Sequence, residues 1–468
     1  MTALKAWIER QARFCAREML RAISATDAVK ERPGFGQRVA PAPGSVLASP
    51  VPAAYDPDPD YFFHWFRDAA IVIDALRVAY TEGWLNGEAL AGFSDFIGFN
   101  QSLRDLNGAA FLAQGDFRAR VQPGFLQYLR ADAELAAVSG DAVFAEARVN
   151  ADATLDFTGW SRPQNDGPPL RALALLRWEP LPSVDDDLRA KLRELIGADI
   201  AFTLARANEP CFDIWEEESG FHYFTQLVAV EALERGGEWC SRAGDADRAC
   251  ACRDAAQGAA TRLGSLWDAS AGCYRSRVGV GNGDPLKRLD IAVVLATLCA
   301  GRASGPHSVL DPKAQATLAT LEALFDATYA INRHRVEDRG PAMGRYSGDA
   351  YYSGGAWYVS TLAAAEFYFK LALALRSGAD PAATEENARF RHGLGVEANA
   401  SRTAWADAAF ARGDAFMSTV RDFTPPSGEL SEQFDKSTGA QTSAKRLTWS
   451  YAAFITAAAS RREAFSAI

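Results

Sequence analysis

The sequence is poor in the residues that metal, redox and nucleophilic catalysis use. It contains five histidines and seven cysteines among 468 residues, and no group of them has the spacing of a zinc site. His64 and His222 lack the Ser or Cys partner motif of a catalytic triad. The run Asp185-Asp186-Asp187 follows Pro182-Ser183 and is interpreted as acids that cap a helix, not as a metal motif. We therefore expect neither a metal nor a cofactor.

Long apolar runs and an excess of basic residues are also missing. No stretch of about 18 uncharged apolar residues occurs, so no membrane span is expected. The 49 basic and 59 acidic residues give a net charge of −10, which disfavours nucleic acid and anionic membranes because both bind basic faces. Hydrophobic residues make up 48% of the chain, as in a globular protein with a large core. We expect a monomer with a neutral ligand.

The cysteines and the N-terminus bear on location. An odd number of cysteines scattered along the chain is typical of reduced thiols and not of a disulfide framework. Residues 2–10 are charged and amphipathic, without the apolar core of a signal peptide. A cytoplasmic protein is expected, with a periplasmic or secreted one left open for a chain whose leader has been removed.

Helical periodicity dominates the rest of the chain. Apolar residues recur at i, i+3 and i+4 in about thirteen segments, many of them rich in Ala. Residues 289–300 and 357–374 are apolar all round, whereas 186–204 and 246–263 carry polar stripes, which predicts inner helices wrapped by outer ones. The segments lie near 3–24, 66–82, 86–105, 124–139, 168–179, 184–207, 221–236, 243–264, 287–300, 311–331, 356–377, 383–397 and 443–461.

No linker or break in composition divides the chain, so we expect one all-α domain over 1–468. Residues 1–60 would supply an N-terminal helix and a Pro-rich, irregular lead-in. Loops between the helices combine aromatic and charged residues, and short hairpins are expected only there. Five such loops predict one concave site assembled from remote positions.

Two acidic clusters have the chemistry that sugar cleavage requires. They are Asp213-Ile214-Trp215-Glu216-Glu217-Glu218 and Ser431-Glu432-Gln433-Phe434-Asp435. Hydrolysis of a glycosidic bond commonly uses one protonated carboxyl for the leaving oxygen and one ionised carboxylate for water or the sugar carbon. The pairing favours a glycosidase.

With these motifs the chain resembles the glucoamylase family, glycoside hydrolase family 15, over nearly its whole length. The matching stretches occur in the family's order. They are Pro59-Asp60-Tyr61-Phe62 through Arg67-Asp68, Arg162-Pro163-Gln164-Asn165-Asp166-Gly167-Pro168, Asp213 to Glu217, Gly344-Arg345-Tyr346, Leu430 to Lys436, and Leu447 to Ala453. The resemblance implies an (α/α)6 barrel with its active site at one end.

The resemblance also implies roles for individual residues. Glu216 matches the family's general acid and Glu432 its general base. The residues that match its substrate-binding positions are Tyr61, Trp65, Arg67, Asp68, Trp160, Trp215, Glu217, Arg345, Trp357 and Trp449. The implied reaction is inverting exo-hydrolysis of α-1,4-linked gluco-oligosaccharides from non-reducing ends, which releases β-D-glucose. We further expect Glu216 to be protonated and hydrogen bonds to keep Glu432 ionised.

Structural interpretations compete with these roles. The Glu216-Glu217 pair could be acids at a helix N-terminus, Glu432 a capping residue, and Arg67-Asp68 a local ion pair; the family match favours the functional reading. For Trp357 and Trp449, site and core are both open.

Two departures from the family's pattern put the linkage in doubt. Glu218 extends the first acidic cluster, and His64 stands in the aromatic motif, so both are expected to reshape the subsite beyond the cleaved bond. The alternatives are α-1,6 linkages of isomaltose or dextran type, or trehalose, and more distantly a sugar-binding toroid without catalysis. The chain has no room for a starch-binding module, which favours soluble oligosaccharides.

Overall fold

Six helices form a closed ring in the computed structural model, which describes residues 3–281, 283–333, 335 and 339–467. Each of these helices contacts the next, and the last contacts the first. In ring order they are α2 (Phe66–Thr81), α6 (Gly167–Trp178), α8 (Tyr223–Arg242), α10 (Ala292–Ala300), α12 (Tyr358–Arg376) and α15 (Thr448–Ser466). A ring of this kind is the inner layer of an (α/α)6 barrel.

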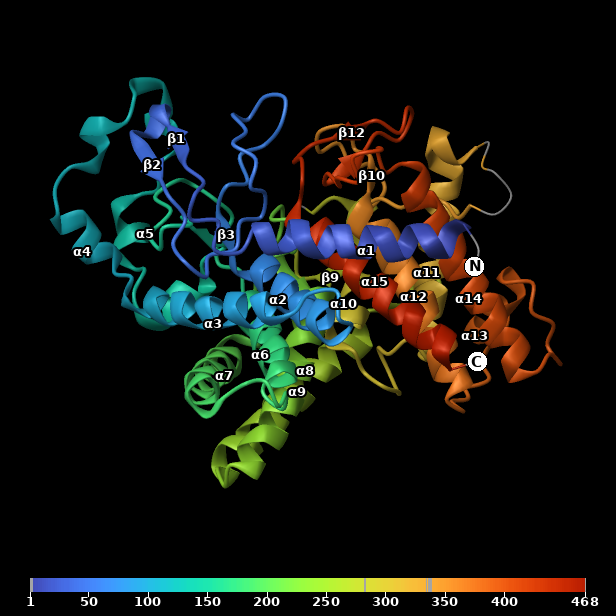
Figure 1. The fold of residues 1–468 in the computed structure, drawn as a ribbon. Helices are drawn as coiled ribbons and strands as arrows, with labels where there is room; N and C mark the ends of the chain where they lie inside the picture. Colours follow the sequence, from blue (N-terminus) through green and yellow to red (C-terminus); the bar gives the residue numbers. More distant parts are fainter. Residues whose placement is uncertain (1–2, 282, 334, 336–338, 468) are drawn as a thin grey trace.

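An outer layer packs on this ring, one helix beside each inner helix (Figure 1). The outer helices are α1 (Ala3–Arg21), α3 (Gly87–Ser102), α7 (Asp186–Arg206), α9 (Ala246–Ser265), α11 (Pro312–Thr328) and α14 (Arg402–Asp422). The short helices α4 (Gly108–Ala113), α5 (Asp132–Ala136) and α13 (Glu385–Gly393) are additions. The predicted all-α (α/α)6 fold is confirmed.

The composition of the helices explains the two layers. Nearly every residue of α12 is buried, because helices on both sides and a third behind cover it. Small residues allow this close approach: a Cβ at Gly413 of α14 would lie 2.5 Å from the ring of Phe369 on α12. Among the described helices, α12 alone is long and apolar enough to cross a membrane, and 83% of its apolar window is buried as core.

Short strands precede several inner helices and orient the loops of one barrel end. They pair β1 (Lys30–Arg32) with β2 (Gln37–Val39), β3 (His64–Trp65) with β4 (Arg148–Val149), and β7 (Trp267–Asp268) with β8 (Cys273–Tyr274). The two three-stranded sheets are β5 (Cys211–Phe212), β6 (Ser219–His222) and β9 (Arg277–Val278), and β10 (Ala356–Trp357), β11 (Gln433–Phe434) and β12 (Gln441–Thr442). Strands β3, β6 and β10 lead directly into α2, α8 and α12.

The prediction of one helix is wrong, and one helix of the outer layer was not predicted. The segment 124–139 holds a 3-10 turn, Pro123–Tyr128, with no buried residue, followed by the five-residue α5; its apolar residues have no barrel helix to pack on. The helix α14 is absent from the prediction, although its buried residues Trp405, Ala409, Gly413, Phe416 and Val420 recur at helical spacing. Two smaller predictions are confirmed. Asp185 caps α7, since its side chain accepts a hydrogen bond from the Leu188 amide, and all seven cysteines are free.

Candidate active site

All twelve predicted site residues line a single cavity of about 380 Å³ at the end of the barrel where the inner helices begin. They come from the loops before α2, α6, α8, α12 and α15 and from the loop that holds Arg345. Residues that the sequence did not single out complete the lining: Ala48, Ser161, Ile214, Tyr351 and Leu447. The two glutamates therefore face the same space although 216 positions of chain separate Glu216 from Glu432.

Glu216 is surrounded by N–H donors. Trp65 Nε1 and Arg67 Nη2 donate to its Oε1 at 2.8 and 3.2 Å. Gln164 Nε2 donates to the same oxygen at 3.0 Å, and Trp160 Nε1 donates to Oε2 at 2.6 Å. The backbone of Glu216 has a φ of 65°, a left-handed conformation that is uncommon outside glycine and that concentrates at functional sites.

Glu432 is held in a drier environment. It is 3% exposed, and burial raises the pKa of its carboxyl to about 7, although a hydrogen bond from Ser443 lowers it. The hydrogen bonds predicted for Glu432 exist, but they do not keep its pKa at the ordinary value, because desolvation of the charged form outweighs them.

Tyr61 lines the same cavity as the two carboxyl groups. Its hydroxyl is 2.7 Å from that of Tyr351. Burial first, then the charge of Glu432 and, more weakly, that of Glu216, raises the pKa of Tyr61 well above its ordinary value. The charges of both glutamates therefore act on this one phenol.

Arg67 and Asp68 begin α2 and reach into the cavity. Arg67 Nη1 donates to Gln164 Oε1 at 2.8 Å and to Asp166 Oδ2 at 3.1 Å, while its Nε lies 3.6 Å from Asp68 Oδ2. Burial raises the pKa of Asp68 to about 6. The predicted local pair exists, but it lines the cavity and is extended by partners on another loop.

Glu217 joins a network of cations. Its Oε1 is 3.0 Å from Arg345 Nη2, and its Oε2 accepts from Lys287 Nζ at 2.5 Å and from Tyr346 Oη at 2.6 Å. Lys287 also pairs with Asp213 at 2.7 Å. The sequence analysis did not identify Lys287, because nothing around it in the chain suggests a partner seventy positions away.

Arg345 has a second partner on its own loop. Asp349 accepts from Nε at 2.8 Å and from Nη2 at 2.5 Å, and Arg345 is 3% exposed. A bidentate pair of this kind fixes the plane of the guanidinium, so the remaining N–H groups point in a set direction.

The family model that describes glycosyl hydrolases family 15 matches residues 35–97 and 144–459. The chain belongs to this family. It is 30% identical over 435 residues to a glucoamylase of Neurospora crassa, covering 90% of this chain and 64% of that protein's length. The chain thus spans less than two thirds of that relative.

Solved structures of this family have the same fold. The glucoamylase of Hypocrea jecorina superposes with a TM-score of 0.80 at 24% identity, covering 98% of this chain and 72% of that one. The glucoamylase of Hormoconis resinae gives a TM-score of 0.79 at 26% identity, covering 98% and 74%. These likenesses agree with the ring of helices described above.

Tryptophans that line this cavity are also packed in the hydrophobic core. Trp357 and Trp449 are 4% and 6% exposed yet line it, so the two interpretations left open both hold. Trp215 stacks near Trp449, with ring centroids 6.5 Å apart. The Trp215 indole donates to Asp290 at 2.9 Å, a residue missed by the sequence analysis.

His64 and Glu218 do not reach the family 15 cavity, so the expectation that they reshape a subsite is wrong. His64 is fully buried and accepts from the Val46 amide at 3.0 Å; burial lowers its pKa to about 3. Glu218 turns away to pair with Arg277 at 2.5 Å. A short motif specifies these residues, but the direction of each side chain follows from what packs around it.

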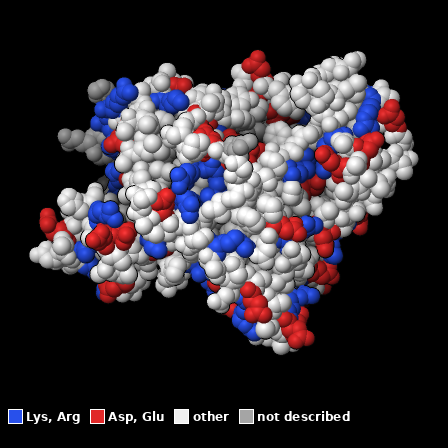
Figure 2. Space-filling model, turned by 180° about the vertical axis from the view of Figure 1, so that it is seen from behind, with Lys and Arg blue, Asp and Glu red and all other residues white. Residues whose placement is uncertain are grey.

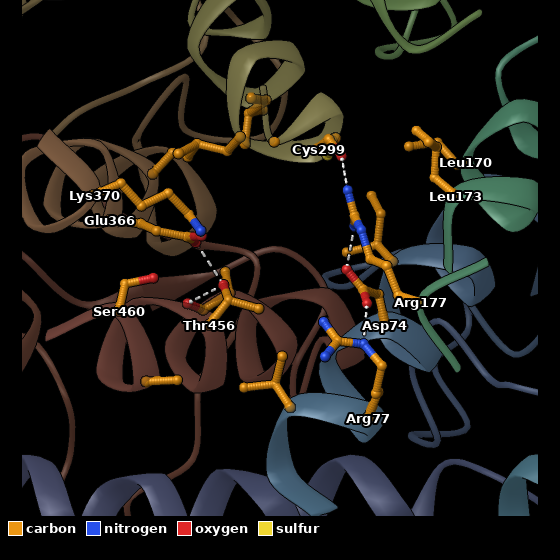
Figure 3. A pocket seen from close by; sticks show the side chains of 18 of the residues that line it. Asp74, Arg77, Leu170, Leu173, Arg177, Cys299, Glu366, Lys370, Thr456 and Ser460 are labelled. Carbon is orange, nitrogen blue, oxygen red and sulfur yellow. Dashed lines mark hydrogen bonds and ion pairs between the residues drawn. The ribbon is translucent and has the colours of Figure 1, made fainter. Parts of the chain in front are cut away.

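A second cavity of about 420 Å³ opens at the other end of the barrel (Figure 3). Five of its charged groups pair with one another: Asp74 with Arg77 and Arg177 at 2.9 and 2.5 Å, and Glu366 with Lys370 at 3.5 Å. None of these residues lines the first cavity; of the two linings, Trp449 alone is shared. The first cavity is therefore the candidate active site.

The surface agrees with a neutral ligand. On the face in Figure 2, basic and acidic residues are interspersed and separated by wide uncharged areas. Within the described part of the chain, no group of three or more His, Cys, Asp and Glu side chains is arranged as a metal site.

Proposed function

We propose that this protein is a glucoamylase: an inverting, exo-acting glucosidase that releases β-D-glucose from the non-reducing ends of α-1,4-linked gluco-oligosaccharides. The observation that carries the proposal is the convergence of Glu216 and Glu432 on one cavity. Exo cleavage is part of the proposal because it is what the chain's membership of glycosyl hydrolases family 15 and its likeness to glucoamylases suggest.

Glu216 serves as general acid and Glu432 as general base. An inverting enzyme holds a water molecule between its base and the sugar carbon, with the two carboxyls ~6.5–9.5 Å apart. Glu432 then removes a proton from this water while Glu216 gives one to the departing oxygen. The sugar carbon inverts, and the product is the β anomer.

The pair needs one proton between its two carboxyls before each turnover. Burial of Glu432 raises its pKa to about 7, and four N–H donors point at the carboxyl oxygens of Glu216. A glycosidic oxygen that is placed against Glu216 would take the position of a donor such as Trp160, and it would receive the proton from Glu216 there.

Arg67, Asp68 and Arg345 bind the hydroxyls of the terminal glucose. Carboxylate and guanidinium groups held by their own partners offer directional hydrogen bonds to hydroxyls, and the pairs of Arg67 with Asp166 and of Arg345 with Asp349 fix them in place. The carboxylate of Asp68 favours the positive charge that develops on the sugar ring, while Arg67 and Arg345 position the hydroxyls. Tyr61, Trp65, Trp160, Trp215, Glu217, Trp357 and Trp449 are proposed to shape the remaining walls.

The rival within the family is cleavage of α-1,6 linkages or of trehalose. It was motivated by Glu218 and His64, and both lie off the cavity, so the α-1,4 reading is favoured. A toroid that only binds sugar would not need both of these carboxyl groups in the lining of one cavity.

A substrate panel tests the function. Glucose release from maltose, isomaltose and trehalose is compared, and the anomer formed is followed by NMR during the first minutes. We expect maltose to be the best of the three and β-glucose to appear first. Preference for isomaltose or trehalose would establish the rival, and no glucose from any of them would establish the toroid.

We further propose a monomer located in the cytoplasm, with neither nucleic acid nor membrane as a partner. Gel filtration and cell fractionation test these points.

A further inference from the structure

The segment that leads into α10 joins the loop that carries Glu216 to the loop that carries Arg345. Asp290 accepts a hydrogen bond from the indole of Trp215, which precedes Glu216 in the chain. The next amide of the segment, that of Ile291, donates to the Arg345 carbonyl at 2.9 Å. The candidate acid and a residue proposed to bind the sugar are therefore tied to each other through this segment.

The carboxyl of Asp290 is fixed in its orientation. The Trp215 indole donates to both of its oxygens, at 3.1 and 2.9 Å, and the Ala292 amide donates to Oδ1 at 2.8 Å. Asp290 is 2% exposed, so water does not compete for these bonds. A buried network of this kind is rigid, and it holds the indole in one position.

Packing alone does not explain an acid at position 290. Burial raises the pKa of Asp290 to about 7, although the hydrogen bonds that it accepts lower the pKa. Taking a carboxyl out of water is costly, and an apolar residue would avoid that cost. Perturbed acids of this kind are concentrated beside functional sites.

Trp215 is both a wall of the cavity and the neighbour of the candidate acid. Its ring lies 5.3 Å from that of Trp357 and 6.5 Å from that of Trp449. The chain turns tightly at this point, because the Glu216 amide donates to the Asp213 carbonyl at 2.9 Å and the φ of Glu216 is 65°. A displaced Trp215 indole would therefore move the adjacent carboxyl as well.

We propose that Asp290 is a positioning residue for the acid half of the reaction: by holding Trp215 it keeps the Glu216 carboxyl directed at the glycosidic oxygen. The inference rests on the proposed hydrolysis, in which Glu216 protonates that oxygen as it departs. Misplacement of a catalytic group by about 1 Å can lower the rate about 10²-fold. Arg67 and Asp68 stand on α2 with partners of their own, so loss of Asp290 lowers kcat more than it raises KM.

The leaving group separates loss of the acid from general damage to the site. Hydrolysis of α-D-glucosyl fluoride releases fluoride, which needs far less protonation than a sugar oxygen does. Asp290→Ala should lower kcat about 10- to 100-fold on maltose but less than about threefold on glucosyl fluoride. Glu216→Gln removes the acid itself and should show the same contrast between the two substrates. Glucose release and a fluoride electrode measure the two rates.

Two further variants test the hydrogen bond itself. Asp290→Asn keeps an oxygen that can accept from the indole, and it should stay within about threefold of wild type on both substrates. Trp215→Phe removes the indole N–H and leaves Asp290 in place, so it should reproduce the contrast even where Asp290→Ala does not fold. An Asn variant as slow on maltose as the Ala variant would overturn the role of the hydrogen bond.

A matched control removes a bond of the same kind outside the cavity. Glu179 accepts from the Trp239 indole at 3.1 Å, and neither residue lines the cavity, so Glu179→Ala should keep both rates. Equal losses on maltose and on glucosyl fluoride in Asp290→Ala would overturn the positioning role and leave the hydrolase intact. Equal losses in Glu216→Gln, or a wild-type protein that cleaves neither substrate, would overturn the proposed function and this inference with it.

Discussion

Ser443 donates its hydroxyl to Oε2 of Glu432 from a left-handed backbone with a φ of 62°. The two residues flank the β11–β12 hairpin, and the amide of Glu432 donates to the Ala444 carbonyl at 2.8 Å. A backbone conformation that few residues adopt thus places the hydroxyl whose hydrogen bond, more than that of Tyr61, opposes the effect of burial on the candidate base.

Removal of this hydroxyl is expected to move the acid limb of the pH profile. The Ser443 bond lowers the pKa of Glu432, which burial has raised to about 7. Without the bond the pKa rises further, and a higher pH is needed to ionise the base. Ser443→Ala should therefore shift the acid limb of kcat/KM upward between pH 4 and 9, while the exposed Ser466→Ala should not. An unchanged limb would mean that another group titrates there.

The two proposed catalytic carboxyls can be separated from their acidic neighbour. Glu216→Gln and Glu432→Gln should each lower kcat by at least about 10²-fold, with maltose still bound in calorimetry. Glu218→Gln is the matched control, because Glu218 pairs with Arg277 outside the cavity. Near-normal turnover in either of the first two variants would refute the assigned role.

Glu432 should also reduce stability as pH rises. Its folded pKa of about 7 lies above the ordinary value of 4.5, so the folded protein binds this proton more tightly than the unfolded chain, and stability is lost between about pH 4.5 and 7. Glu432→Gln cannot ionise and should be more stable than wild type by up to about 3 kcal/mol at pH 8, with no pH-dependent gain below pH 4.5. Urea unfolding at pH 5 and 8 measures the difference, with the exposed Glu88→Gln as control.

Lys287 should be more important for stability than an ordinary surface lysine. It is 2% exposed and neutralises Asp213 and Glu217 at 2.7 and 2.5 Å. Lys287→Met leaves two carboxylates without this cation, so we expect a loss of about 3–5 kcal/mol and a higher KM as Glu217 is released. Lys370→Met breaks a more exposed pair with Glu366 and should cost about 0–1 kcal/mol. Equal losses in denaturant titrations would contradict this reading.

Local pattern was enough to predict much of the barrel. Helices such as α1 and α2 show their period in the chain because buried and exposed positions differ in polarity over many turns. The prediction of a helix over 124–139 is wrong, and α14 was not predicted. Apolar spacing shows that a helix is possible, but a packing partner decides whether it forms. Phe369 supplies that partner for α14 at Gly413, and nothing in the local sequence announces it.

The candidate site divides in the same way. The sequence by itself determined which residues are candidates for the chemistry, since Glu216, Arg345 and Glu432 stand in short motifs whose order can be read without coordinates. Only the tertiary structure decided that His64 points into the core and that Lys287 pairs with Glu217. It also decided that burial raises the pKa of Glu432 to about 7. The identity of each residue is fixed by the chain. The burial of a side chain and its hydrogen-bond and ion-pair partners depend on which distant segments the closed ring of helices brings together.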